Sequence, residues 1–386
     1  MITILFIHQS SELYGSDKTL LLLLKHLDKV KFFPVVVLPN NGPLKGELEK
    51  ENITVILAPV IKLYRKMFSP KNILRFFVEI KLATKTLDDL NKQYHFDIVY
   101  SNTLAVLLGI FYAKKRKIKH IWHVHEIIES PKVFTKLFLK FLAQKSNTKI
   151  VYNSIATQKF WDVNAKISSK SCIIQNGLEI SNTIMSESEV SNYREKFFKA
   201  DKNEIVIALV GRISRMKGQL VLLKAFFELC KTHNNITLVF VGSTPPNQEI
   251  YLEKLNKQIQ EFQIFDKTVI IPFQETISQI WQSIDIAVVP SIEPESFGLV
   301  AIEAMLAKKP VVGANHGGMT GIIVNDVTGF LVKPNNEKAL SEALQKLIVD
   351  LKLRIAFGEK GFERAVTEFS MDNYVNSFED LFSHKI

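Results

Sequence analysis

Residues 205–230 read IVIALVGRISRMKGQLVLLKAFFELC. The first six, Ile205–Val210, form a short apolar and β-branched run, as in a buried strand, and Gln219–Cys230 has the apolar pattern of a helix packed on a sheet. The loop between them carries two glycines and three cations. A strand, a loop and a helix in this order are the repeating unit of a parallel sheet covered by helices, so the stretch predicts an α/β fold.

The same alternation continues outward in both directions. Predicted strands are Ile2–Ile7, Val35–Leu38, Thr54–Leu57, Ile98–Tyr100, His120–Val124, Lys149–Tyr152, Ile205–Val210, Thr237–Val241, Thr268–Ile271, Ile286–Val289 and Pro310–Val312. Predicted helices between or after them include Asp17–Leu27, Asn72–Leu90, Pro131–Gln144, Gln219–Cys230, Gln248–Phe262, Leu299–Leu306, Glu337–Val349, Leu351–Glu368 and Met371–Phe382. The strands fall into two series of similar size, which predicts two Rossmann-like domains.

A polar stretch, Glu179–Asn192, separates the two series and is the expected linker. The predicted domains are therefore 1–180 and 181–370, with a last helical segment over 371–386. Open parallel sheets bind ligands at the carboxyl ends of their strands. A site in a cleft between the two domains is expected.

Composition excludes several classes of protein. The 386 residues are 47% hydrophobic and 23% charged, which excludes a disordered or collagen-like chain. Cys172 and Cys230 are too few for a disulfide framework or a thiolate zinc site and indicate a reducing compartment. The run Ile2–Ile7 lacks the basic leader of a signal peptide, and the longest apolar stretch is about half of a membrane-spanning helix. A cytoplasmic protein is predicted.

The loop Gly211–Gln219 is the first candidate site. Arg212 and Lys217 stand where a strand ends and a helix begins, so they could neutralise a phosphate beside the free N–H groups of that helix. A solvated basic turn is the alternative, and it is the commoner one for an isolated Arg and Lys.

Residues 290–305, PSIEPESFGLVAIEAM, are the second candidate site. Pro294 keeps the loop extended and the helix is expected to start near Gly298, which places Glu295 in the loop and Glu303 on the second helical turn. Carboxylates that accept hydrogen bonds from sugar hydroxyls, beside N–H groups that bind phosphate, are what a nucleotide-sugar site requires. Alternatively, Glu295 only favours the helix through its dipole and Glu303 faces solvent.

Together the two segments resemble the retaining glycosyltransferases of family 4, of the group 1 and GT-B class. The two glutamates match that family's E-x7-E motif. Weaker matches follow the family's order along nearly the whole chain: Tyr14-Gly15-Ser16, His125-Glu126, Asn153-Ser154, Asn176-Gly177 and Gly317-Gly318. The resemblance implies a GT-B fold, in which an acceptor-binding domain and a donor-binding domain face a cleft and the C-terminal helix crosses back to the first domain.

The resemblance also implies a role for each matching residue. Arg212 and Lys217 would bind the donor pyrophosphate, Glu303 the ribose and Glu295 the sugar hydroxyls, with His125 hydrogen-bonding the donor sugar and Glu126 behind it. The implied catalytic residues are His125, Arg212, Lys217 and Glu295. The implied donor-binding residues are Gly15, Ser16, Arg212, Lys217, Pro272, Phe273, Glu295, Ser296, Phe297, Gly298, Leu299, Val300 and Glu303. Tyr14 departs from the family, which has a second glycine at that position.

His123 and His125 would share one face of a strand, a spacing that can bind a metal. No third ligand is evident nearby and the sequence has no Asp-x-Asp. We therefore expect no metal and no other cofactor, and a structural role for His123. No carboxylate can be assigned as a nucleophile, so the resemblance favours same-face attack with retention.

The net charge of +10 is unevenly distributed. Residues 1–180 hold 27 basic and 14 acidic residues, a net of +13, whereas residues 181–386 hold 22 and 25, a net of −3. The basic residues in the first half lie between aromatic ones: Lys62, Arg65, Lys66, Lys71, Arg75, Lys81 and Lys85 with Phe68, Phe76 and Phe77; Lys114, Lys115, Arg116, Lys117 and Lys119; and Lys132, Lys136, Lys140 and Lys145 with Phe134, Phe138 and Phe141.

Such basic amphipathic helices suit an anionic membrane surface, unless the aromatic residues are core and the lysines merely solvated. No nucleic-acid-binding module is recognised. The expected partners are thus a nucleotide-sugar donor, a saccharide or lipid-linked acceptor and the inner face of the cytoplasmic membrane.

The sequence predicts a metal-independent, retaining hexosyltransferase of bacterial surface polysaccharide biosynthesis. Two alternatives stay open: a nucleotide-sugar enzyme without transfer, of the hydrolysing epimerase type, and a non-catalytic nucleotide-sugar-binding protein.

Overall fold

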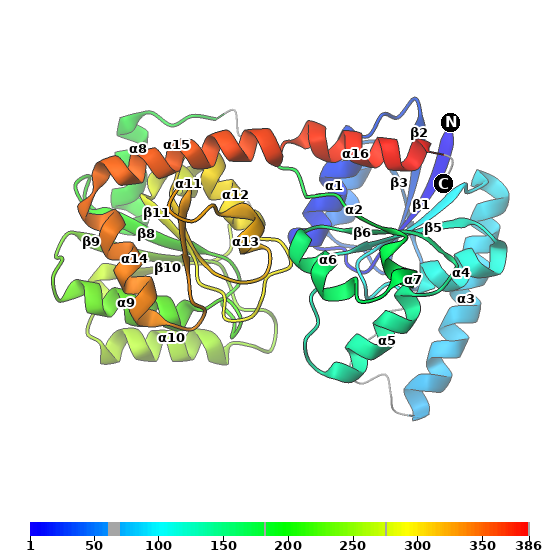
Figure 1. Ribbon diagram of the computed structural model, residues 1–386, viewed down its shortest axis with the longest axis horizontal. Helices are drawn as coiled ribbons and strands as arrows, with labels where there is room; N and C mark the ends of the chain where they lie inside the picture. Colours follow the sequence, from blue (N-terminus) through cyan, green and yellow to red (C-terminus); the bar gives the residue numbers. More distant parts are fainter. Residues whose placement is uncertain (61–69, 181–182, 275, 385–386) are drawn as a thin grey trace. The chain divides into compact units, whose positions relative to one another are not determined.

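The computed structural model describes residues 1–60, 70–180, 183–274 and 276–384. The chain divides into two compact units, Met1–Gly177 with Met371–Ile386, and Leu178–Ser370. In each unit a twisted parallel sheet lies between helices (Figure 1). The predicted class, α/β with two Rossmann-like parallel sheets, is confirmed.

In the first unit, the described residues form a seven-stranded sheet in the order β3-β2-β1-β4-β5-β6-β7. Its strands are β1 Ile2–His8, β2 Phe32–Leu38, β3 Thr54–Leu57, β4 Ile98–Asn102, β5 Lys119–Val124, β6 Asn147–Tyr152 and β7 Ser171–Ile173. Its helices are α1 Gly15–His26, α2 Pro43–Lys50, α3 Pro70–Tyr94, α4 Leu108–Arg116, α5 Lys132–Leu142, α6 Ile155–Trp161, α7 Ala165–Ser168 and α16 Met371–Ser383.

The described residues of the second unit form a six-stranded sheet in the order β10-β9-β8-β11-β12-β13. Its strands are β8 Ile205–Val210, β9 Ile236–Val241, β10 Thr268–Ile271, β11 Ile286–Val289, β12 Val311–Ala314 and β13 Gly329–Val332. Its helices are α8 Glu187–Tyr193, α9 Gln219–Cys230, α10 Ile250–Glu261, α11 Ser278–Ser283, α12 Leu299–Leu306, α13 Met319–Ile322, α14 Glu337–Val349 and α15 Leu351–Glu368, with short helical turns at Arg194–Phe198 and Phe265–Lys267.

Each sheet is buried on both faces, which explains why its central strands are continuously apolar. Along β8, Ile207 and Leu209 enter one core with the helices α9, α10 and α14, whereas Val206 and Ala208 enter the opposite core with α11, α12 and α15. Alternate residues of a strand point to opposite faces, so one apolar run supplies both layers.

The strands β7 and β13 were not predicted from the sequence. β7 reads SCI and β13 reads GFLV, so neither shows the run of β-branched residues by which the four-residue edge strands β3 (TVIL) and β10 (TVII) were predicted. The predicted linker also differs from the structure, because α8 lies within it. Ser186 and Glu189 form a capping box at the start of this helix, in which the Glu189 amide donates to the Ser186 hydroxyl and the Ser186 amide donates to the Glu189 carboxylate.

The C-terminal helix α16 belongs to the first unit (Figure 1). Phe378 and Phe382 are buried with Phe6 and Phe32 of the first sheet, and the Tyr374 hydroxyl donates to the Thr19 carbonyl of α1. A helix encoded at the end of the chain therefore completes the core of the unit formed at its beginning.

Candidate functional site

The predicted site residues of the second unit cluster where its strand order reverses. The helix after β8 and the helix after β11 cover opposite faces of the sheet, and ligands of open parallel sheets bind at such a switch point, beyond the carboxyl ends of the strands. The loops are joined there by a hydrogen bond of 2.7 Å from the Ile292 amide to the Met216 carbonyl. Gly218, with φ of +78°, lies so close that a Cβ would be 2.2 Å from the Pro290 carbonyl oxygen.

An ion pair between Lys217 and Glu295 connects the two predicted motifs. The distance from Lys217 Nζ to Glu295 Oε1 is 2.8 Å, and these side chains are 22% and 15% exposed. The Ser291 hydroxyl donates to the same carboxylate oxygen. Burial alone would raise the pKa of Glu295, but Lys217 and Ser291 outweigh it and hold this pKa below its ordinary value. Glu295 is therefore a fixed, charged acceptor, and more than a helix cap.

The loop after β12 supports Glu295 from behind. The Gly318 amide donates to the Glu295 carbonyl at 2.6 Å, and His316 Nε2 donates to the Ser291 carbonyl at 2.8 Å. Gly317 has φ of +57°, and a Cβ there would lie 2.4 Å from the Glu295 carbonyl oxygen. Only glycine fits this approach. From the sequence, Gly317-Gly318 was identified as a family match without a role, and Ser291 and His316 were not identified as site residues.

The helix α12 begins as predicted, with Gly298 as its N-cap at φ of +127°. Phe297 is buried in the core, whereas Ser296, Leu299 and Val300 are half-buried. Glu303 is half-buried and its Oε2 atom is buried. The alternative that Glu303 simply faces solvent is therefore wrong.

The other predicted residues of the second unit follow β8 and β10, at the same edge of its sheet. Arg212 is exposed, and its carbonyl accepts a hydrogen bond from Gln219 Nε2. Pro272 and Phe273 follow β10 and are exposed, and the Phe273 amide donates to the Ser243 hydroxyl at 2.9 Å.

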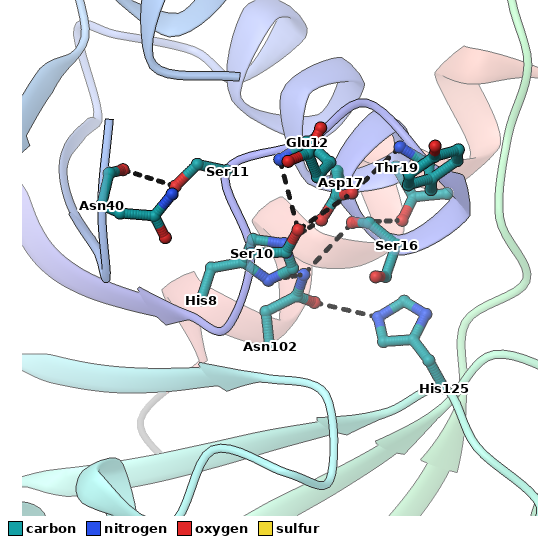
Figure 2. A network of polar contacts seen from close by, with 11 residues as sticks. His8, Ser10, Ser11, Glu12, Ser16, Asp17, Thr19, Asn40, Asn102 and His125 are labelled. Atoms are coloured by element: carbon teal, nitrogen blue, oxygen red, sulfur yellow. Dashed lines mark hydrogen bonds and ion pairs between the residues drawn. The ribbon is translucent and has the colours of Figure 1, made fainter. Parts of the chain in front are cut away.

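At the carboxyl ends of β1, β4 and β5 in the first unit, His8, Asn102 and His125 form a buried polar network with Asp17 (Figure 2). Gly15 and Ser16 are the first two residues of α1, whereas the sequence predicted that this helix starts at Asp17.

His123, predicted to be structural, is buried on β5, with Nδ1 2.6 Å from the Tyr100 hydroxyl. The Glu126 carboxylate accepts hydrogen bonds from the backbone amides of Leu104 and His125. Burial raises the pKa of Glu126 to about 7. In the described part of the chain, no group of three or more His, Cys, Asp or Glu side chains could hold a metal ion.

The basic residues of α5 lie on its outer side. Its lysines, Lys132, Lys136 and Lys140, are exposed, whereas Phe138 is buried and Phe134 and Phe141 pack against the core. The aromatic side chains of this helix are therefore core residues. Lys62, Arg65, Lys66 and Phe68 lie outside the described residues, as do the side chains of Lys71, Arg75, Phe76 and Phe77.

Comparison with known proteins assigns the second unit to a family. The model of the family described as "Glycosyl transferases group 1" matches residues 191–364, nearly all of the second unit. This unit belongs to the glycosyl transferases group 1.

Two curated relatives extend the match. The Staphylococcus aureus protein "Capsular polysaccharide biosynthesis glycosyltransferase CapM" is 26% identical over 378 residues, 92% of this chain and 97% of that protein. "Uncharacterized glycosyltransferase MJ1607" of Methanocaldococcus jannaschii is 29% identical over 235 residues, 60% of this chain. The match spans only 53% of MJ1607.

The fold of the chain also matches solved structures. The crystal structure of Anabaena Alr3699/HepE in complex with UDP and glucose superposes with a TM-score of 0.85 at 23% identity, covering 99% of this chain and all of that one. The likeness shows the GT-B fold. No helix among the described residues combines the length and apolar character needed to cross a membrane.

Proposed function

We propose that the protein is a retaining, metal-independent glycosyltransferase that moves a sugar from a nucleotide-sugar donor to a hydroxyl group of a saccharide acceptor. The observation that carries this proposal is the Lys217–Glu295 pair at the carboxyl ends of the adjacent strands β8 and β11. It sets a cation and a fixed carboxylate beside the N-terminus of α12.

The donor would bind through charges and hydrogen-bond donors of the second unit. Arg212 and Lys217 would neutralise the diphosphate, together with the free amides at the start of α12. Glu303 would accept hydrogen bonds from the ribose, and Glu295 from the donor sugar. HepE is described as a complex with UDP, which makes UDP the first nucleotide to test.

The proposed reaction requires stabilisation of the negative charge on the departing diphosphate. Lys217, held in place by Glu295, would supply positive charge there together with Arg212 and a helix N-terminus. No carboxylate is assigned as a nucleophile, so we propose same-face attack, in which the leaving phosphate oxygen takes the proton of the acceptor hydroxyl. The new bond joins the anomeric carbon to the acceptor oxygen and the bond to the diphosphate breaks.

The relatives support a biological setting for this reaction. CapM is named for capsular polysaccharide biosynthesis, which supports a surface polysaccharide as the product and a lipid-linked saccharide as the acceptor. We further propose that the basic surface of the first unit docks on the cytoplasmic membrane. Because the α5 aromatics are core residues, attraction by Lys132, Lys136 and Lys140 would act without insertion.

Ligand binding and turnover test this function separately. Thermal shift with UDP and a panel of nucleotide sugars should identify the donor, since a ligand that binds the folded state raises its melting temperature. NMR of the reaction with an acceptor panel should then show a product with the donor's anomeric configuration. Binding without turnover would indicate a non-catalytic protein, and conversion of the sugar without an acceptor would indicate an epimerase.

Cosedimentation with anionic liposomes tests the docking. Binding at low salt should weaken at high salt because screening removes the attraction. The triple variant Lys132→Glu, Lys136→Glu, Lys140→Glu should bind less. No binding of the wild type at low salt would refute the docking without affecting the proposed reaction.

A further inference from the structure

Four buried polar side chains form a chain of hydrogen bonds at the carboxyl edge of the first sheet (Figure 2). His8 Nε2 is 2.5 Å from Asp17 Oδ1, and His8 Nδ1 is 3.0 Å from Asn102 Nδ2. Asn102 Oδ1 is in turn 2.9 Å from His125 Nε2. The exposed fractions of the four residues lie between 0% and 8%. Buried contacts of this length fix both rotamers and protons.

The Ser16 carbonyl determines the direction of every hydrogen bond in this chain. It lies 3.3 Å from Asn102 Nδ2, and a carbonyl oxygen can only accept, so this atom must be the amide NH₂. The same NH₂ donates to His8 Nδ1, which leaves the His8 proton on Nε2, directed at Asp17. The amide oxygen of Asn102 then faces His125 and requires a proton on His125 Nε2.

The other ring nitrogen of His125 is consequently an acceptor. Burial, with a smaller contribution from His8, lowers the pKa of His125 to about 3, so the ring is neutral near pH 7. With its proton on Nε2, Nδ1 carries a lone pair. Within the residues that the structure describes, Nδ1 has no hydrogen-bond partner.

We propose that Asn102, held by His8 and Asp17, is a positioning residue that fixes His125 in the Nε2–H tautomer and leaves Nδ1 to accept a hydrogen bond from a hydroxyl of the donor sugar. This inference rests on the proposed function for the identity of the ligand. The tautomer itself follows from the contacts alone.

Asn102, at the end of β4, also connects this strand to the first turn of α1. Its NH₂ donates to the carbonyl of Ser16 in the first turn of α1, and Asp17 anchors the same turn by accepting from the Tyr14 amide at 2.9 Å. Loss of the Asn102 amide should therefore release the His125 ring and leave Asp17 and its cap in place.

The first test is the tautomer in the wild-type protein. NMR of ¹⁵N-histidine-labelled protein distinguishes Nε2–H from Nδ1–H rings by the pattern of ring correlations, and the variant His125→Gln identifies the His125 signals by their loss. We expect a neutral Nε2–H ring for His125. An Nδ1–H ring or a charged ring near pH 7 would overturn the proposal, and this result needs no activity.

The second test compares Asn102→Ala with Asn147→Ala. Asn147 is a matched control, because its buried amide lies 2.7 Å from His120 Nδ1 in the same sheet. Asn102→Ala should yield mixed His125 tautomers and lower kcat roughly ten- to hundredfold, as loss of an outer partner does at other sites, with UDP affinity retained. Asn147→Ala should keep the tautomer and kcat.

The outcomes separate the two proposals. Unchanged tautomer and kcat in Asn102→Ala would overturn the positioning role, as would an equal loss of kcat in Asn147→Ala at equal thermal stability. If Asn102→Ala fails to fold, the similarly sized Asn102→Leu replaces it, because it also removes the amide oxygen that faces His125 Nε2 and should give mixed tautomers. A wild-type protein that turns over no nucleotide sugar would refute the proposed function and leave the tautomer result valid.

Discussion

Replacing Lys217 by methionine should destabilise the second unit, because Glu295 would keep its burial and lose its cation. Removing one partner of a fully buried ion pair costs about 3–5 kcal/mol. Since Lys217 and Glu295 are 22% and 15% exposed, we expect a smaller loss, about 2–3 kcal/mol at pH 7. Methionine keeps most of the lysine side-chain stem, so the loss of unfolding free energy measures the effect of removing the charge. Urea denaturation measures it.

The destabilisation by Lys217→Met should depend on pH, in a direction that follows from the pKa of Glu295. In the wild type, the pKa of Glu295 lies below its ordinary value, so its stabilising contribution is present above the unfolded pKa and is lost as the pH falls through the folded pKa. In Lys217→Met, burial is opposed by Ser291 and His316 but no longer by Lys217, so the folded pKa rises and protonation relieves the penalty. The difference between the two proteins should therefore shrink from pH 7 towards pH 4.

A double-mutant cycle isolates the pair. Lys217→Met combined with Glu295→Gln should be more stable than Lys217→Met alone, because no unpaired charge stays buried. A loss of stability that is the same at pH 7 and pH 4, or a coupling energy near zero, would refute the reasoning.

Three further predictions concern single side chains. Gly317→Ala should lower the melting temperature, because its Cβ would lie 2.4 Å from the Glu295 carbonyl oxygen. The control Gly321→Ala, where a Cβ would meet nothing within 4 Å, should not lower it. Equal melting temperatures of the two variants would contradict this prediction. Phe378→Ala should cost about 3–5 kcal/mol in urea denaturation, since Phe378 is fully buried between α16 and the first sheet; a loss below about 1 kcal/mol would show that α16 contributes little to that core. Burial raises the pKa of Glu126 from 4.5 to about 7, so wild-type stability should fall as the pH rises between these values, and Glu126→Gln should lack that component of the fall; parallel pH profiles of the two proteins would argue against it.

Much of the fold could be predicted because both sheets consist of buried parallel strands. Ile205–Val210 is continuously apolar and ends at a glycine, so both its type and its limits follow from the sequence. β7 and β13 could not be found, since the sequences SCI and GFLV lack the β-branched run of the edge strands β3 and β10, which were predicted.

The sequence allowed us to predict residues of the candidate site, but not which of them are in contact. Lys217 and Glu295 were both identified, but they are 78 residues apart in the chain, and only the adjacency of β8 and β11 brings them together. His8 and Asn102 were missed because no sequence motif marks them. Their contact needs the knowledge that β1 and β4 are neighbours in the sheet.

The return of α16 to the first unit has a consequence for synthesis on the ribosome. Residues 1–177 leave the ribosome first, but the helix that packs on Phe6 and Phe32 follows only after the whole of Leu178–Ser370. The first unit must wait with an open apolar surface while the second unit, continuous in sequence, can fold. The part of the chain made first would then be the last to reach its native state, and the more exposed to chaperones in the interval.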